Sequence, residues 1–432
     1  MRLTGRSSAT KGGCVSETFE WFLGIDWGSE AHALWLLDAH GATRGSRTVA
    51  HTASAVHEAL QWLREQTSVL PAQIAVGIET PRGVLVDTLI EHGFSVFALN
   101  PKQLDRFRDR FTVAGAKDDD RDAQVLADAV RTDRRAFRRV RADDPLIVEL
   151  REVTRLREDL HDDERRLANR LRDQLYRVDA AWLAASPAAD EPWLWAILAQ
   201  VPDPDRWRRL SRRRVAALLR AHRIRRVTAD QIVDGLHQPR LTVAPGVTAA
   251  VRTRIAALVP QLEVVAAQRR VAERHIDALL DQLTPVEALE PAPREHRDVE
   301  ILQSLPGVGR IVTATMLSEA TAAVADRDYP TLRAYTGVAP VTKRSGKRAF
   351  FVHMRYACKW RLRNALYHWA RTSIQRDAGA RTYYDGLRQR GHSHARALRS
   401  VADRWLRILV AMLRTRTLYD PSRFAPAVEI IT

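Results

Sequence analysis

A chain of 432 residues is too long for one small hydrophobic core, so two or three domains are expected. Its formal net charge of +16 and isoelectric point near 10.6 favour a polyanionic partner, most simply DNA or RNA. No apolar run approaches the about 18 residues that a membrane-spanning helix needs, and no secretory signal is recognisable, so no membrane partner is expected. Two cysteines, Cys14 and Cys358, are too few for a zinc site and indicate a reducing cytoplasm.

The first part of the chain predicts a mixed α/β domain. Residues 1–18, rich in Ser, Thr and Gly, predict a disordered lead-in. Strands are then expected at residues 21–26, 33–37, 46–50, 73–79 and 94–99, and helices at residues 54–66 and 83–92. A meander of hairpins that begins with an acid at a strand tip is typical of the RNase H-like (RuvC-like) fold, which we place at residues 19–145.

Two acids end apolar strands in this domain. Asp26 ends the first predicted strand and Glu79 ends the fourth. Ligands bind at the carboxyl ends of strands in open α/β sheets, although many strands simply end on a polar residue. Carboxylates that converge there hold two magnesium ions about 3.5–4 Å apart, which is the arrangement for phosphodiester cleavage.

A run of aspartates opens the helix that follows these strands. Asp119 and Asp122 lie three residues apart and share a helix face, so both side chains reach one ion; Asp118 and Asp122 are the competing pair. Carboxylates this close repel each other unless a cation lies between them. The alternative is that these acids only cap the helix.

Residues 146–290 predict a helical arm. Leucines and valines recur at three- and four-residue steps over residues 146–178, and a second such segment, residues 258–283, returns antiparallel to it. The pattern fits a coiled coil that forms a homodimer or homotetramer, or a pair of long helices packed within one chain. A basic helical insertion is expected between them, at about residues 181–245.

The insertion carries a dense run of arginines. Residues 206–226 contain ten arginines and no acid, with Trp207 among them. Such a run is often a solvated helix face, but unbalanced charges repel without a counter-charge, so a phosphate-binding surface is favoured. The candidate contacts are Arg208, Arg209, Arg212, Arg213 and Arg214.

Residues 291–432 predict a mainly α C-terminal domain that begins with a helix-hairpin-helix. Gly307 and Gly309 lie in a Pro-Gly-x-Gly turn between two helices, and glycines of this kind let backbone amides approach a phosphate. A turn of the same composition also occurs between helices that bind no ligand.

A serine lies among basic residues further along this domain. Ser345 is expected in a loop beside Gly346. Its basic neighbours, all candidate nucleic-acid contacts, are Lys343, Arg344, Lys347 and Arg348. Cationic groups stabilise the charge of a pentacovalent phosphorus, so this serine is a candidate nucleophile, although a plain turn serine is the commoner explanation.

Taken together, these motifs resemble one family, the insertion-sequence transposases of the IS110 family, over residues 19–413. The resemblance rests on Asp26, on residues 77–79, on residues 100–103 with Arg106 and Phe107, on Lys117, Asp119 and Asp122, on residues 305–309, and on residues 337–340 with Ser345 and Gly346. Asp118 stands where the family more often has Thr or Asn, which blurs the choice between Asp118 and Asp119.

The resemblance implies a RuvC-like DEDD domain followed by a transposase domain with a catalytic serine. By motif, the acidic tetrad falls on Asp26, Glu79, Asp119 and Asp122, holding Mg²⁺, and the nucleophile on Ser345. It further implies a prokaryotic, nucleoid-associated DNA recombinase. This enzyme forms a covalent phosphoserine link with element or target DNA and takes a bridge RNA as its guide.

Two other functions remain open at this level. A RuvC-like endonuclease that resolves DNA junctions needs the acids but no hydroxyl at position 345. A nucleic-acid-binding protein without catalytic activity needs neither the acids nor the hydroxyl.

Overall fold

The chain divides into two compact units, an N-terminal unit of residues 1–143 and a C-terminal unit of residues 144–432. The predicted disordered lead-in lies outside the described residues, apart from residue 18. The computed structural model describes residues 18–108, 110, 118–240, 242–284, 297–345 and 348–424, without the side chains of residues 102, 343–345, 348–352 and 423–424.

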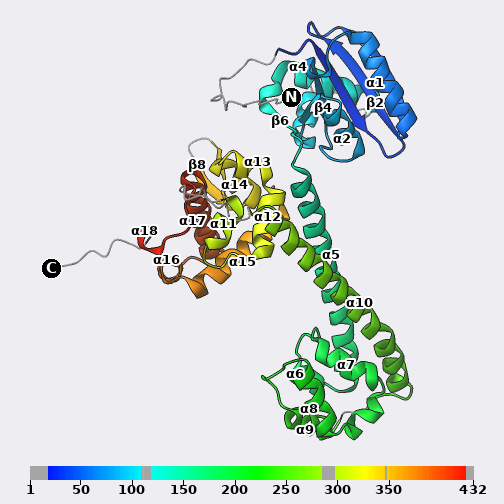
Figure 1. Cartoon of the computed structure of the whole chain (residues 1–432), viewed down its shortest axis with the longest axis vertical. Coiled ribbons are helices and arrows are strands. Elements are labelled where there is room, and N and C mark those ends of the chain that lie inside the picture. Colours follow the sequence, from blue (N-terminus) through cyan, green and yellow to red (C-terminus); the bar gives the residue numbers. More distant parts are fainter. Residues whose placement is uncertain are drawn as a thin grey trace, which may run out of the picture. The chain divides into compact units, whose positions relative to one another are not determined.

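The N-terminal unit is built on a six-stranded mixed sheet in the order β3-β2-β1-β4-β5-β6 (Figure 1). Strand β1 pairs antiparallel with β2 and parallel with β4, so it lies between a hairpin and a crossover connection. The strands are β1 Trp21–Trp27, β2 Ala31–Asp38, β3 Thr43–Ala50, β4 Ile74–Ile78, β5 Ser95–Ala98 and β6 Arg138–Arg139.

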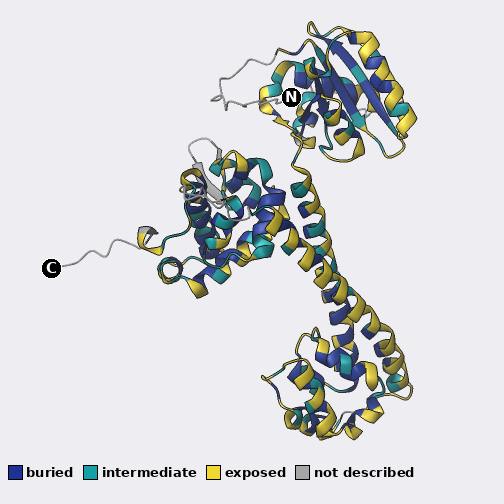
Figure 2. Cartoon of the chain, in the orientation of Figure 1, coloured by how far each residue is buried: buried dark blue, intermediate teal, exposed yellow. Residues whose placement is uncertain are grey.

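Helices cover both faces of this sheet. Successive side chains of a strand point to opposite faces, so Leu23 and Ile25 of β1 pack towards α1 and α2 while Phe22 packs towards α3 and α4. Figure 2 shows the buried strands between these layers. The helices are α1 Ala53–Thr67, α2 Val84–Glu91, α3 Pro101–Arg108 and α4 Asp119–Asp133. The predicted mixed α/β N-terminal part and mainly helical remainder are confirmed.

Helix α4 lies on the central strands with backbone against backbone. A Cβ atom at Gly24 of β1 would lie 1.8 Å from the carbonyl oxygen of Ala123, and one at Gly77 of β4 would lie 2.7 Å from that of Leu126. Only glycine fits at such distances. These two glycines therefore fix where the acidic start of α4 meets the sheet.

The C-terminal unit contains two long antiparallel helices, α5 Pro145–Val178 and α10 Val247–Gln282. Apolar residues line their contact, and charged pairs flank it. The ion pairs are Arg157–Glu273 and Glu164–Arg269, and His275 Nε2 lies 2.8 Å from a carboxylate oxygen of Glu149. The two predicted helical segments thus pack on each other within one chain, and their role in dimerisation stays a prediction.

A small helical bundle is inserted between α5 and α10. Four tryptophans form its centre, and all are fully buried: Trp182, Trp193, Trp195 and Trp207. Trp207 is therefore a core residue and is not available to stack on a nucleic-acid base. The elements of the bundle are α6 Ala181–Ala185, α7 Pro192–Gln200, η3 Pro204–Arg209, α8 Arg212–Ala221 and α9 Ala229–His237.

The remaining elements form one helical core with a β-hairpin. Trp369 and Trp405 stack in this core with ring centroids 6.0 Å apart. The helices are α11 Asp298–Ser304, α12 Arg310–Glu319, α13 Thr321–Ala325, α14 Tyr329–Thr336, α15 Trp360–Arg376, α16 Ala378–Gln389, α17 His394–Thr415 and α18 Pro421–Phe424; the hairpin strands are β7 Val341–Ser345 and β8 Arg348–His353. None of the helices in the described ranges is long and apolar enough to cross a bilayer.

Charged contacts join helix α5 to this core. Arg155 pairs with the buried Glu319 of α12 at 2.7 Å, and Arg361 of α15 pairs with Glu158 at 2.8 Å. Glu319 is buried, so removing Arg155 would leave a buried charge without its partner and destabilise the contact of α12 with α5.

Replacing Gly24 by alanine should destabilise the N-terminal unit by about 3 kcal/mol, because the new methyl group has no room against Ala123. Hydrogen exchange in the full chain should show faster exchange in the β1 and α4 peptides. Gly386→Ala is the matched control: nothing lies within 4 Å of its Cβ position, and alanine should stabilise helix α16 by about 0.5–1 kcal/mol. Unchanged protection of β1 and α4 in the Gly24 variant would contradict the packing described.

Candidate active site and nucleic-acid interface

Asp26 and Glu79 leave neighbouring strands at the same edge of the sheet. The parallel register of β1 and β4 pairs Ile25 with Ile78. Asp26 follows Ile25 within β1, and Glu79 is the first residue after β4. Both acids are half-buried. The structure thus brings together the two strand-end acids that the sequence singles out.

The acids of α4 differ in exposure. Asp122 is buried, with 2% of its surface exposed, whereas Asp119 and Asp118 are exposed in and before the first turn. Asp118 makes no side-chain capping hydrogen bond, so capping does not explain this residue. Burial of Asp122 follows from the close packing of the next residue, Ala123, on Gly24.

Arg108 at the end of α3 neutralises Asp122. Its Nε donates to Oδ1 at 2.5 Å and its Nη2 to Oδ2 at 2.6 Å, which is the two-pronged geometry of a strong arginine–carboxylate pair. Its Nη1 donates to Asp105 at 2.6 Å. The hydrogen bond with Asp122 raises the pKa of Arg108 and burial opposes this; the charges of Asp122, Asp105 and Glu79 raise it further. The guanidinium therefore lies in the electrostatic field of two predicted metal ligands.

Among the described residues, no group of three or more His, Cys, Asp or Glu side chains is arranged to hold a metal ion. The acids fit Mg²⁺ only in kind, because they offer hard oxygen ligands, whereas the buried carboxylate of Asp122 is already paired with a cation. The cation at Asp122 is the Arg108 guanidinium. Asp26, Glu79, Asp119 and Asp122 are the residues that would hold metal.

Ser345 is the last residue of β7, facing Arg348 across the hairpin, and not a loop residue as the sequence suggested. Its side chain, Gly346 and Lys347 lie outside the described residues. Lys343 and Arg344 belong to β7 and Arg348 begins β8, so three of the four predicted basic neighbours, those within the described residues, belong to one hairpin.

The glycines of the predicted helix-hairpin-helix lie between α11 and α12, in different surroundings. Gly307 has φ +83°, and a Cβ there would lie 2.7 Å from the backbone nitrogen of Ser373 on α15, so packing within the protein requires this glycine. Nothing lies within 4 Å of a Cβ at Gly309. The role of both glycines in phosphate binding stays a prediction.

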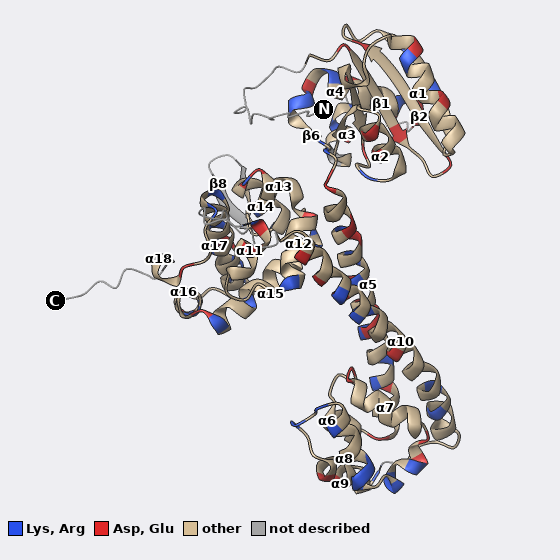
Figure 3. Cartoon of the chain, in the orientation of Figure 1, with Lys and Arg blue, Asp and Glu red and all other residues tan. Residues whose placement is uncertain are grey.

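The arginines of the insertion are exposed, and some of them form ion pairs with acids. Arg212 pairs with Asp230 at 2.7 Å and with Asp234 at 2.5 Å, both on α9. Arg206 pairs with Asp203 and Arg226 with Glu191, so the expectation that this run lacks counter-charge was wrong for these three arginines. In the described part of the chain neither Arg209 nor Arg213 makes an ion pair. Figure 3 marks the positions of Lys and Arg in blue along the ribbon, including helix α8. Arg214 instead donates to Gln200 and Arg208 to a backbone carbonyl.

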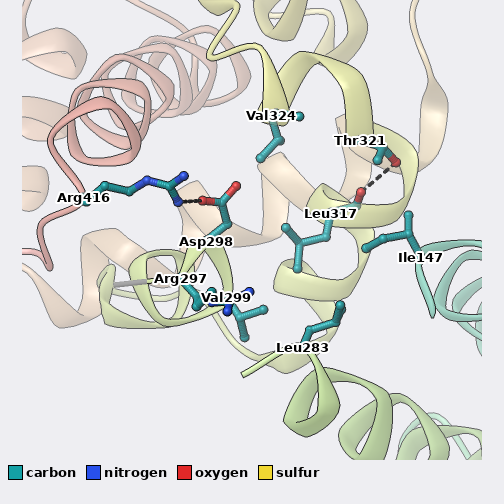
Figure 4. Close-up of a pocket in the computed structure, with 10 residues that line it drawn as sticks. Ile147, Leu283, Arg297, Asp298, Val299, Leu317, Thr321, Val324 and Arg416 are labelled. Carbon is teal, nitrogen blue, oxygen red and sulfur yellow. Dashed lines mark hydrogen bonds and ion pairs between the residues drawn. The ribbon is translucent and has the colours of Figure 1, made fainter. Parts of the chain in front are cut away.

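A cavity of about 560 Å³ lies elsewhere in the C-terminal unit (Figure 4). Ile147 and Leu317 line it together with Asp298, which pairs with Arg416 at 2.9 Å. None of the residues predicted as catalytic lines this cavity, so it is separate from the candidate active site.

Two segments of the chain match models of transposase families. Residues 23–179 match a model described as a transposase, that of the IS110-type DEDD domain. Residues 299–385 match a model described as a transposase of the IS116/IS110/IS902 family. The mixed sheet with acids at its edge and these two matches define a DEDD-type transposase.

Named relatives span almost the whole chain. A Streptomyces coelicolor protein assigned as the mini-circle transposase for IS117 is 32% identical over 421 residues, which cover 94% of this chain and 97% of that protein. The IS110 element protein of the same organism is 30% identical over 420 residues, which cover 95% of this chain and 97% of that protein. Protein y4uE of Sinorhizobium fredii, assigned as a transposase, is 46% identical over 48% of this chain and 58% of its own length. The chain belongs to the IS110 family of insertion-sequence transposases.

Gly309→Ala should keep the stability of the full chain within about 1 kcal/mol, because its Cβ position is open and only the helix N-cap changes. If the turn approaches a phosphate, the added methyl group should lower the affinity for duplex DNA. Fluorescence anisotropy with labelled element-end DNA measures this, and an unchanged affinity would contradict the phosphate role of the turn.

Proposed function

We propose that this transposase excises and inserts an insertion-sequence element with an acidic tetrad that holds two Mg²⁺ ions and with Ser345 as nucleophile. The observation that supports it most is the register of β1 with β4, which sets Asp26 beside Glu79, with α4 packed on Gly24 next to them. This arrangement falls inside the segment that matches the DEDD model.

The acids have a clear part in this reaction. When bound, the magnesium ions supply Lewis-acid stabilisation of the oxygens that enter and leave phosphorus. Asp26 and Glu79 orient their carboxylates from rigid strand ends, and Asp122 does so from a helix pinned to the sheet. Rigid elements position catalytic groups more accurately than loops do.

The serine step conserves phosphodiester bonds. The bond from Ser345 Oγ to phosphorus forms as the bond from phosphorus to a deoxyribose oxygen breaks. The proton lost by the serine hydroxyl is balanced by the proton gained by the leaving oxygen. The number of phosphate ester bonds stays constant, so a second hydroxyl of DNA can reverse the link without an external energy source. Lys343, Arg344, Lys347 and Arg348 supply positive charge to the transition state.

The serine and the acids belong to different units of the chain. We therefore propose that DNA binding assembles the working site from both, within a homodimer or homotetramer held by the long helices. The exposed arginines of the insertion, Arg209 and Arg213 above all, form the surface for a bridge RNA that guides the enzyme to its DNA.

Wild-type protein incubated with element-end DNA, Mg²⁺ and candidate RNA should form a protein–DNA adduct that survives denaturation. Ser345→Ala should abolish it and lower transposition at least about a thousandfold. Thr342→Ala, which removes another hydroxyl from β7, should leave the adduct in place. Glu79→Gln should also prevent the adduct, because it removes one of the carboxylates proposed to hold Mg²⁺.

Other outcomes identify other functions. Cleaved DNA with no adduct in wild type or Ser345→Ala would indicate a junction-resolving endonuclease. Full activity of a Glu79→Ala variant would contradict any role of the acidic edge in catalysis.

Replacing Arg209 and Arg213 together by glutamine should weaken RNA binding and flatten the slope of log affinity against log salt by about 0.7–0.9 for each lost phosphate contact. Arg212→Gln is the matched control and should have a smaller effect, because Asp230 and Asp234 already neutralise that charge. Filter binding over a salt series measures both. An unchanged slope in the double variant would show that this surface does not face the phosphates.

A further inference from the structure

We propose that Arg108 is a built-in counter-cation that holds Asp122 until metal arrives and is displaced from it by Mg²⁺, so that Arg108 sets the metal affinity of the site. This inference rests on the proposed function, because it takes Asp122 as a metal ligand.

The first argument is occupancy. Both carboxylate oxygens of Asp122 accept hydrogen bonds from Arg108, at 2.5 and 2.6 Å. A divalent ion placed on the same oxygens would meet a positive guanidinium within a few ångströms, and like charges at that distance repel strongly in a partly buried site. Arg108 therefore competes with a metal ion for the charge of Asp122, and a metal ion on these oxygens weakens the two-pronged pair.

The second argument is the cost of an unpaired charge. The Asp122 side chain is 3% exposed, and a buried carboxylate without a partner destabilises a protein strongly. Arg108 removes this penalty in the metal-free protein. The same pairing must be broken when metal binds, so it lowers the apparent affinity for the ion.

The third argument is that Arg108 has another place to bind. Its side chain is 28% exposed, and it already donates to Asp105, one turn earlier on α3 and 64% exposed. The guanidinium can turn towards Asp105 and water without becoming an unpaired buried charge. Asp105 thus remains a hydrogen-bond partner for the Arg108 guanidinium after the guanidinium leaves Asp122.

The test compares metal binding in the full chain without DNA. Arg108→Gln removes the competing charge and should raise the affinity for Mg²⁺ about tenfold or more, since a charge-assisted pair no longer has to be broken. Isothermal titration calorimetry measures this affinity. The metal-free melting temperature of the variant should fall, and its rise on adding Mg²⁺ should exceed that of the wild type. Arg106→Gln, exposed on the same helix, is the matched control and should change neither.

If Arg108→Gln does not fold without metal, Arg108→Lys gives the same comparison. An ammonium keeps the charge but cannot make the two-pronged contact, so its Mg²⁺ affinity should lie above that of the wild type. Equal or weaker Mg²⁺ binding by the variant that folds would overturn the inference while leaving the metal site intact. Absence of Mg²⁺ binding in wild type and variant alike would overturn the inference and also the magnesium part of the proposed function.

Discussion

The close packing of helix α4 on strand β1 is the constraint on which the rest of this structure depends. Gly24 has no side chain, so the backbone of Ala123 lies directly against the strand. Asp122, the residue before Ala123, is buried on the same helix, and Asp26 lies two residues after Gly24 on the same strand. A buried carboxylate is costly unless a cation is paired with it, and the cation paired with Asp122 here is the Arg108 guanidinium.

The division of the chain into two units suits a reaction that must be controlled. The acids belong to the N-terminal unit and Ser345 to the hairpin of the C-terminal unit. Under the proposed mechanism neither unit can complete strand transfer alone. Under the further inference Arg108 adds a second level of control, because its pair with Asp122 must be broken before metal binds there.

Much of this architecture could be predicted from the sequence. Alternating and buried apolar runs identified β1 to β5, and helical periodicity identified the two long helices, because these patterns follow directly from side-chain geometry. The acids at the sheet edge were also predictable, since Asp26 and Glu79 end apolar strands. The matches to transposase families over residues 23–179 and 299–385 agree with the predicted family and with the mixed α/β N-terminal domain, whereas the catalytic role of the two acids stays a prediction.

Other features depended on contacts that a sequence does not show. Arg108 follows Arg106 and Phe107 of a noted motif, but its partner Asp122 is identified only once α3 and α4 are placed together. The arginine run looked unbalanced because the acids that pair with Arg212 come from α9, beyond it. The sequence places Trp207 among arginines without indicating its role, and the structure shows it fully buried in the core of the insertion.

The most direct test of the central claim is to locate the metal. Crystals of the protein with element-end DNA and Mn²⁺, measured at the manganese absorption edge, give anomalous density for the ion alone. The account predicts density within coordination distance of Asp26, Glu79 and Asp122, with the Arg108 guanidinium moved away from Asp122. Manganese bound elsewhere, with the pair of Arg108 and Asp122 intact in a complex that has cleaved its DNA, would contradict it.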